Sequence, residues 1–438
     1  MLKTPFRWAA GRAGTTEEAA RFWLLVLVVG LMSGLAGGLY VEALRALTRV
    51  LGPQHWARAT HLVLFGVVGG AIGVLTLLLG NPGDVELLVD NIHIQGGAAD
   101  LRKLPSLIPI SLLGIATGSA IGPEAPLVQT TGSLGSWIAR RGKVSVIEAR
   151  SLTITGMAAG FTVLFGTPLG SAIFALEILH RRGLQYYEAL VPAALGSLSG
   201  YAVYVLTTHL GLTPIWHFPE VRALHASALG IAVLAGVAGA AIAYAFSYLT
   251  TWLRHGFRLL PVALRPVAGG LALGGLAWMS PYALTFGEGQ IQTLVNGRLL
   301  VSTLLVATLA KLLGSSTIVS SGWRGGFIIP LFFMGAALGK AGASVLHVDA
   351  TVAMLSLMVA ANVGVTKTPF GSALIVVEMA GVRMFPPVLA ASLIAFFLTS
   401  QVSLIHTQRA REGAFAPEIH SRDPNPGGGA DRYAGPPA

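Results

Sequence analysis

The chain has 438 residues, of which 53% are hydrophobic and only 11% are charged, and none of them is a cysteine. The absence of cysteine excludes disulfides, thiolate chemistry and cysteine-bound metal ions. A net charge of +10 would favour nucleic acid as the partner of a soluble protein, but so apolar a chain predicts a polytopic membrane protein that binds no nucleic acid.

Residues 1–20 predict a short cytoplasmic N-terminal segment, and long apolar runs follow it. The runs lie at residues 23–43, 60–79, 104–121, 151–179, 187–206, 226–250, 266–280, 299–313, 327–346 and 352–405. Several are long enough to cross a hydrocarbon layer of about 30 Å. Their apolarity is solid rather than alternating, which predicts helices rather than a β-barrel. The runs at 151–179 and 352–405 are too long for one span, so we expect a re-entrant or paired segment in each.

Basic residues gather at the ends of these runs and predict the orientation of the chain. They include Lys3, Arg7, Arg12, Arg140, Arg141, Lys143, Arg181, Arg182, Arg254, Arg258, Arg409 and Arg411. Positive loops stay in the cytoplasm, so we expect both termini inside and a location in the cell inner membrane or plasma membrane. The first run has no small-residue cleavage pattern and is interpreted as a retained helix. Residues 406–438 turn polar and predict a disordered cytoplasmic tail.

Four polar side chains precede the third apolar run, namely Asp84, Glu86, Asp90 and His93. Their spacing does not match a compact metal-binding loop. We therefore expect helix capping or the lining of a channel mouth here, and no bound metal.

Residues 122–126 read Gly-Pro-Glu-Ala-Pro directly after an apolar stretch. Glycine and proline interrupt a helix, and a proline in a first turn favours a new helix start at about Ala125 or Pro126. A helix that begins inside the membrane points free N–H groups and the positive end of its dipole at whatever precedes it, which makes an anion site. Residues 325–330 repeat the arrangement, so we expect two helix starts to converge on one dehydrated anion.

Glu124 lies within the first of these helix starts. A carboxylate in the membrane is costly, and for that reason it usually carries function. We interpret Glu124 as a tethered anion that competes with the substrate for the same amides and leaves when it is protonated or displaced. The alternative is an acid that merely caps the next helix.

Three pairs of segments repeat in the same order along the chain. They are residues 83–89 with 289–295, 122–127 with 326–331, and 167–177 with 368–378, at spacings of 206, 204 and 201. A duplicated apolar unit interrupted by glycine and proline is the signature of a transporter whose site lies between its two halves. The sequence thus predicts an all-α polytopic membrane protein with two inverted-topology helical repeats, at 21–206 and 207–405, and with broken and re-entrant helices.

Residues 118–129 resemble the gating-glutamate motif of the CLC family of chloride channels and chloride/proton exchangers, with Pro123 and Ala125 in place of its usual Arg and Gly. Residues 326–330 are similar to the family's second filter motif, and Pro168 and Pro369 match its paired helices. The resemblance covers about residues 20–405. It implies an antiparallel pair of repeats forming a homodimer in the lipid bilayer, with one pore per subunit. The residues after 405 are too few for the family's cytoplasmic regulatory domains, which we expect to be missing.

The resemblance also implies transport of chloride or a similar small anion through a pore gated by Glu124, without a cofactor. The backbone groups expected to bind the anion are those of Gly122, Pro123, Glu124, Ala125, Phe327 and Ile328.

The chain departs from the family's pattern in places that bear on coupling. The first filter motif, which supplies a serine, has no match, and its nearest segment contains Gly83, Asp84 and Val85. The tyrosine expected after the last membrane helix is also missing. Glu177 matches the first of a glutamate pair on the exchangers' proton route, but the second is Ile178, which cannot relay a proton.

We therefore expect passive, channel-like conduction, with Glu177 as a candidate proton relay only if its helix is rotated or shifted. One alternative is a chloride/proton or other anion/proton antiporter with a non-standard proton route. A cation-coupled transporter is a further alternative, suggested by the acids at 84–90. An enzyme is not expected, because Ser199 lies only in a near match to a membrane serine-protease signature. Lys311 and Lys367, within apolar surroundings, either snorkel or neutralise a carboxylate.

Overall fold

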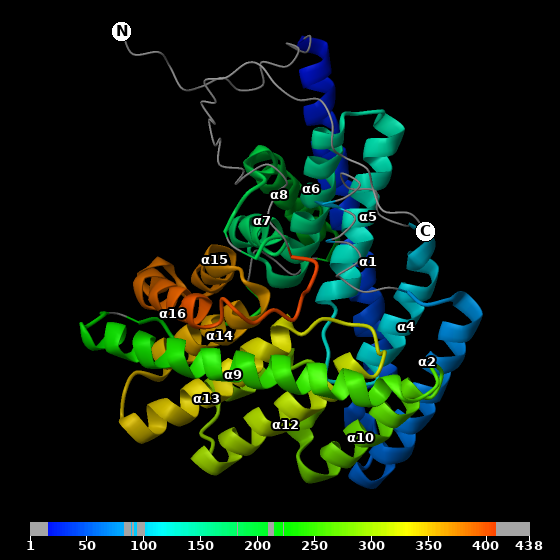
Figure 1. Ribbon diagram of the computed structural model, residues 1–438. Coiled ribbons are helices and arrows are strands. Elements are labelled where there is room, and N and C mark those ends of the chain that lie inside the picture. The colour runs from blue at the N-terminus through cyan, green and yellow to red at the C-terminus, as the bar shows by residue number, and fades with distance from the viewer. Residues whose placement is uncertain are drawn as a thin grey trace, which may run out of the picture.

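The structure is a computed structural model that describes residues 16–82, 89, 92–93, 101–181, 183–208, 214–221 and 223–408. These residues are predominantly helical, as predicted (Figure 1). The helices of the first half are α1 (Thr16–Leu51), α2 (His61–Leu79), α4 (Leu104–Ala116), α5 (Glu124–Gly142), α6 (Val146–Phe165), α7 (Pro168–Glu177) and α8 (Leu190–Thr208). Those of the second half are α9 (Ser227–Arg258), α10 (Arg265–Met279), α11 (Glu288–Asn296), α12 (Val301–Ser320), α13 (Ile328–Leu346), α14 (Ala350–Thr366), α15 (Pro369–Ala380) and α16 (Phe385–Leu398).

Short 3₁₀ helices occupy several of the connections. They are Pro53–His55, Arg58–Thr60, Leu101–Lys103, Tyr187–Ala189, Pro281–Ala283 and Val382–Met384. The described part of the chain contains no β-strand, but Gly122 and Gly326 form an isolated antiparallel bridge.

The two longest apolar runs are broken where the sequence predicts. The run at 151–179 is divided between α6 and α7, and the run at 352–405 holds α14, α15 and α16. Pro168 and Pro369 occupy the first position of α7 and α15, where a missing N–H costs no hydrogen bond. Before them, α6 and α14 end at Gly166 and Lys367, which are both left-handed, with φ of 69° and 62°.

The repeat extends through the helix boundaries. The helices α2, α5 and α6 begin at residues 61, 124 and 146, and α10, α13 and α14 begin 204 residues later, at 265, 328 and 350. The contacts repeat as well, because α1 packs against α6 and α8 while α9 packs against α14 and α16. Each half is therefore one copy of the same helical unit.

The two copies have opposite orientations, as α2 and α10 show directly. These counterparts pack side by side and antiparallel, since Gly73 of α2 lies against Ala263 just before α10, whereas Leu62 near the start of α2 lies against Gly274 late in α10. The Gly122–Gly326 bridge is also antiparallel and joins equivalent residues. Such self-complementary pairing is what a two-fold relation produces, and it confirms the predicted inverted repeat.

Small residues allow close helix packing within each half. Gly30 and Gly34 on α1 face Gly196 and Gly200 on α8, where a side chain on either α1 residue would overlap the α8 backbone. In lipid, close approach of this kind replaces the hydrophobic drive for helix association. It places α1 firmly beside α8, next to the site described below.

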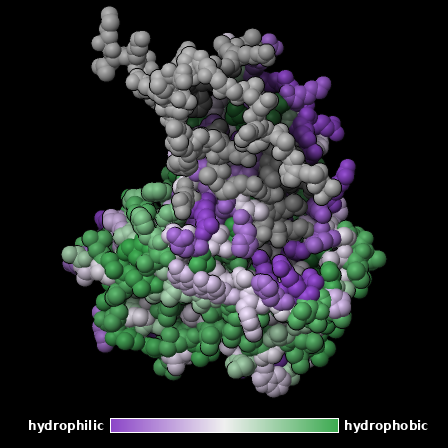
Figure 2. Space-filling view, in the orientation of Figure 1, coloured by the Kyte–Doolittle hydropathy of each residue, from purple (hydrophilic) through white to green (hydrophobic). Residues whose placement is uncertain are grey.

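The outer surface is that of a membrane protein. Six helices of the described chain are long and apolar enough to cross a membrane, by length and composition. Large apolar side chains such as Leu78 on α2, Trp252 on α9 and Met279 on α10 are exposed. Figure 2 shows a broad hydrophobic surface over the helices of the second half. A broad exposed apolar surface marks contact with a membrane or another protein, and the six long apolar helices favour the membrane.

Candidate functional site

The starts of α5 and α13 meet at the boundary between the two halves. The N–H of Gly122 donates to the carbonyl of Gly326 at 2.8 Å, and the N–H of Gly326 donates to the carbonyl of Gly122 at 2.6 Å. The two helices begin two residues beyond this bridge, at Glu124 and Ile328. First-turn amides have no acceptor within their own helix, so both starts present N–H groups and positive dipole ends.

The carboxylate of Glu124 occupies the helix start of the opposite half. Its Oε1 accepts a hydrogen bond from the N–H of Ile329 at 2.6 Å, although Glu124 itself is the first residue of α5. The residue is 1% exposed. Its Oε2 is buried and has no hydrogen-bond partner among the described residues. Glu124 therefore does not simply cap its own helix, because it reaches α13 with one oxygen and leaves the other unpaired.

The glycines of the bridge make room for this carboxylate. A side chain at Gly122 or at Gly326 would overlap the carboxyl group of Glu124. A Cβ at either position would therefore have to displace this carboxylate, because the backbone bridge and the acid share one small space.

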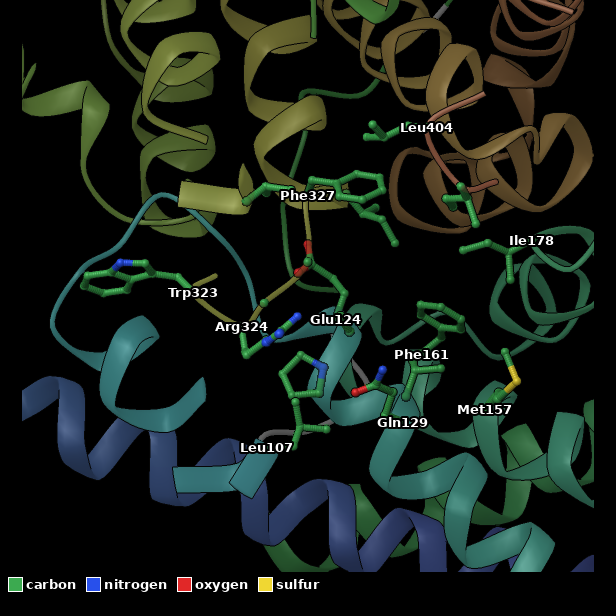
Figure 3. Close-up of a pocket in the computed structure, with 18 of the residues that line it drawn as sticks. Leu107, Glu124, Gln129, Met157, Phe161, Ile178, Trp323, Arg324, Phe327 and Leu404 are labelled. Carbon is green, nitrogen blue, oxygen red and sulfur yellow. The ribbon is translucent and has the colours of Figure 1, made fainter. Parts of the chain in front are cut away.

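A cavity reaches Glu124 from one side, and we call it the Arg324 cavity (Figure 3). Its volume is about 100 Å³, and its polar lining comes from Glu124, Gln129, Arg254 and Arg324, with apolar side chains around them. Figure 3 shows Phe327 beside the carboxyl group of Glu124. The guanidinium of Arg324 donates to Oδ1 of Asn81 at 2.5 Å. The cavity has room for a small anion, and its lining includes two arginines and the starts of α5 and α13.

A second cavity, the Arg45 cavity, reaches the residue that precedes Glu124. It measures about 520 Å³, and Pro123 forms part of its wall. Its charged lining residues in the described chain are Arg45, Arg49 and Glu288. The two cavities share no lining residue, yet Pro123 lines one and Glu124 lines the other. The Glu124 side chain therefore stands on the boundary between two cavities that both carry arginines.

The predicted backbone groups are brought together only in part. Phe327, Ile328 and Ala125 line the Arg324 cavity at the two helix starts. The Gly122 amide already donates its hydrogen bond to the Gly326 carbonyl, and Pro123 has no N–H to donate. The observed partner of the acid is the amide of Ile329, one residue beyond the expected pair.

Other predicted positions lie away from this boundary. Gly83, Asp84 and Val85 fall outside the described residues. Glu177 is buried, and its two oxygens accept from the N–H groups of Phe370 at 3.2 Å and Gly371 at 2.6 Å, at the start of α15. It lines neither cavity. Ile178, the residue after it, does line the Arg324 cavity.

The α7–α15 pair is reciprocal. Glu378 of α15 accepts from the N–H of Gly170 in α7 at 2.6 Å, just as Glu177 of α7 caps α15. Gly170 and Gly371 face the backbone of the opposite helix so closely that a Cβ on either would lie 2.5 Å from a backbone nitrogen. The repeated segments 167–177 and 368–378 thus form two helices, each of which caps the start of the other.

The two buried lysines donate hydrogen bonds to carbonyl groups rather than to carboxylates. Lys311 donates to the carbonyls of Leu284 and Thr285 at 2.7 and 2.6 Å. Lys367 donates to the carbonyls of Gly364 and Thr399, both at 2.6 Å. Both side chains are fully buried, so neither snorkels to a membrane surface.

Sequence reasoning missed the residues that reach the site from distant segments, above all Arg45, Glu288 and Arg324. Many other arginines also lie near the ends of apolar segments, so nothing in the local sequence distinguishes Arg45 and Arg324 from them.

No group of three His, Cys, Asp or Glu side chains in the described chain is placed to hold a metal ion. Ser199 donates to the Leu195 carbonyl at 2.9 Å and packs against α1.

Comparisons with known proteins concern the family and the fold of the chain. The family model described as voltage gated chloride channel matches residues 84–400. The chain is 26% identical over 400 residues to a Pseudomonas syringae pv. tomato protein named chloride/fluoride channel protein, covering 89% of this chain and 86% of that protein. Its structure is similar to that of a CLC-type fluoride/proton antiporter (TM-score 0.77, 24% identity, 90% of this chain and 99% of that one). It is equally similar to that of a slow cyanobacterial Cl⁻/H⁺ antiporter (TM-score 0.77, 19% identity, 86% of this chain and 94% of that one). At these identities the structural likeness shows the fold alone.

Proposed function

This chain belongs to the voltage-gated chloride channel (CLC) family of anion transporters, and from that premise we propose that it conducts chloride or a similar small anion passively, gated by Glu124. The observation that carries the proposal is the bond between the Glu124 carboxylate and the Ile329 amide, at a helix start between two cavities. A carboxylate bound there holds the place that a permeant anion would take.

The gate follows from competition for the same amides. While Glu124 is ionised, its Oε1 satisfies the α13 start and its side chain closes the boundary between the cavities. A proton on the carboxylate removes the charge, and the charge-assisted hydrogen bond weakens to an ordinary one. An anion then replaces the acid at the amides. Backbone dipoles hold the anion without a full positive charge that would trap it.

The cavities suit an anion on both sides of the gate. Arg254 and Arg324 line one, and Arg45 and Arg49 line the other. Basic groups at the walls of a narrow, low-dielectric entrance raise the local anion concentration. The described linings hold four arginines against two acids, Glu124 and Glu288, and two positive helix ends lie between them. This balance of charge favours an anion over a cation.

Passive conduction rather than proton exchange is supported by the lining of the Arg324 cavity. Apart from Glu124, its described lining residues include no acid, histidine, lysine or tyrosine, and Ile178 is the residue at the position of the expected relay. Glu177 uses both oxygens on the α15 start. A proton would need water alone to travel this way. Proton-coupled exchange is the second candidate, because two solved structures that share the fold are described as antiporters.

Basic residues gather where the start of α1 meets the end of α5, and they indicate the orientation in the membrane. Arg21 near the start of α1 donates to the Gly142 carbonyl at the end of α5, where Arg140 and Arg141 also lie. We place this basic end in the cytoplasm, together with both termini, in a bacterial inner membrane or plasma membrane.

A homodimer through α7 and α15 would explain one exposed acid. Glu378 is exposed in the single chain on a flank that also exposes Leu169 and Phe370. A carboxylate facing lipid is costly, and a second copy packed on this flank would cover it.

The experiment is ion flux from liposomes that contain the purified protein. Efflux of chloride, fluoride, bromide and nitrate is measured with and without a proton gradient. We expect anion efflux down its gradient and no uphill proton movement. Uphill proton uptake driven by an outward chloride gradient would overturn passive conduction, and its loss in Glu177→Gln would name that residue as the relay. Cation flux without anion flux would overturn the proposal as a whole.

A further inference from the structure

Glu288 is a second carboxylate on the path to the gate. It is the first residue of α11 and follows Gly287, whose φ of 105° turns the chain into the helix. The indole N–H of Trp216 donates to the Glu288 carbonyl at 2.9 Å, which fixes the backbone at this point. Its side chain lines the Arg45 cavity. An acid in a first helical turn is favourable for the helix dipole, but that explains neither its place in the cavity nor its lack of a bonding partner.

The carboxylate of Glu288 accepts no hydrogen bond from the part of the chain that the structure describes. The nearby cation is engaged elsewhere, because Arg45 donates to Oε1 of Glu42 at 2.7 Å and to the hydroxyl of Tyr204 at 3.3 Å. Glu288 therefore faces the cavity as a charged acceptor that only water can serve.

The titratable groups that face Glu288 across this cavity are Arg45 and Arg49 on α1 and Tyr201 and Tyr204 on α8. Arginine and tyrosine side chains do not take up protons around neutral pH. In the described lining, Glu288 is thus the one group able to accept a proton from the solution on that side.

The position of Glu288 relates it to Glu124. Pro123 belongs to the same cavity wall as Glu288, and Glu124 is the next residue in the chain. A proton that reaches Glu124 from this side must cross the Arg45 cavity, which is large enough for several waters. A negative charge in an anion entrance reduces anion attraction. The Glu288 carboxylate is therefore better suited to binding a proton than to binding the anion.

We propose that Glu288 takes up protons from the Arg45 cavity and passes them through water to Glu124. The inference rests on the proposed gate and adds the route by which the gate is protonated. In the first step a carboxylate oxygen of Glu288 accepts a proton from a hydronium ion or buffer acid and becomes neutral. In the second step that proton moves through water to the Glu124 carboxylate. Glu288 is again negative, Glu124 is neutral, and the Ile329 amide is released to an anion.

The test is the speed of the flux response to a pH drop. Liposomes containing the full chain are mixed rapidly with acid on one side, and the rise of chloride flux is followed. Glu288→Gln is expected to slow this rise by about a hundred-fold, the low end of what a positioned proton carrier contributes. The slowing is expected only for acid added on the side of the Arg45 cavity. Glu288→Asp, which keeps a carboxylate, is expected to retain most of the rate.

The matched control is Glu220→Gln. Glu220 is an exposed acid paired with Arg383 at 3.7 Å and does not line the cavity, so its loss is expected to leave the response unchanged. An unchanged rate in a folded Glu288→Gln protein overturns the inference. So does an equal slowing for acid added on either side, or an equal slowing in Glu220→Gln. A wild-type protein without acid-activated anion flux overturns the proposed gate instead.

Discussion

At two of the junctions between the halves of this chain, a glutamate of one half lies on a helix start of the other. At the α7–α15 junction the arrangement is complete, because Glu177 caps α15 and Glu378 caps α7. At the α5–α13 junction it is one-sided, because Glu124 caps α13 while its counterpart 204 residues later is Ile328. Neither Glu177 nor Glu378 lines a cavity, whereas Glu124 lines the Arg324 cavity and its neighbour Pro123 lines the Arg45 cavity.

The difference shows how one motif serves structure in one place and transport in another. A helix start buried in a membrane protein needs an acceptor for its amides. Two fixed carboxylates satisfy both starts and hold the helices together. One carboxylate, with an oxygen left unpaired, leaves amides that an anion from either cavity is able to use.

The largest effect is expected from breaking the closed junction. Glu177→Ala leaves the N–H groups of Phe370 and Gly371 without their acceptor, and each unpaired buried donor costs about 1–3 kcal/mol. We expect a marked fall in melting temperature in detergent and no change in the pH dependence of flux. Glu220→Ala, which removes an exposed acid, is the control. A stable Glu177→Ala protein with altered gating would mean that the two junctions do not differ in role.

A smaller effect is expected from completing the open junction. Ile328→Glu supplies the missing counterpart of Glu124, so that a second carboxylate reaches the start of α5. One charge-assisted hydrogen bond of about 1.5–3 kcal/mol corresponds to roughly a ten- to hundred-fold loss of chloride flux at neutral pH. Ile328→Gln, of the same size without the charge, controls for the change in packing. Equal flux in folded Ile328→Glu and Ile328→Gln would argue against the comparison.

The smallest effects come from adding one methyl group at each junction. In Gly371→Ala the new Cβ meets the backbone of Phe174, which cannot move aside, so overpacking costs about 1–3 kcal/mol of stability. In Gly326→Ala the Cβ meets the carboxyl end of Glu124. That flexible side chain is displaced from Ile329, and we expect less loss of stability and a flux raised a few-fold. Melting curves and chloride efflux rates are measured on both variants. A larger loss of stability in Gly326→Ala, or a raised flux in Gly371→Ala alone, would contradict the expected difference.

The sequence was informative wherever the chemistry is local. Glycine and proline around Glu124 predicted a helix start within one or two residues of the observed one, and the echoes at 167–177 and 368–378 predicted the breaks at Pro168 and Pro369. The antiparallel packing of α2 on α10 confirms the inverted repeat that these echoes implied.

What could not be predicted depends on partners from distant segments. A repeat shows that Glu177 and Glu378 are equivalent, but not that each caps the helix of the other. The amide that Glu124 binds belongs to Ile329, 205 residues away, and the bridge that uses up the Gly122 amide arises only when the halves meet. Likewise Arg45 and Glu288 look like ordinary helix-end charges until folding brings them to one cavity.

The central claim is that the charge on Glu124 closes the boundary between the cavities, and one measurement tests it most directly. Chloride efflux from liposomes is measured as a function of pH for the wild type and for Glu124→Gln, which keeps the shape of the protonated acid. The account predicts that wild-type flux rises as pH falls, whereas the variant conducts at every pH with a flat profile. At neutral pH the variant is expected to conduct about ten- to hundred-fold faster, from the loss of a bond worth about 1.5–3 kcal/mol. A folded Glu124→Gln protein that carries no anion, or that keeps the wild-type pH profile, would contradict the account.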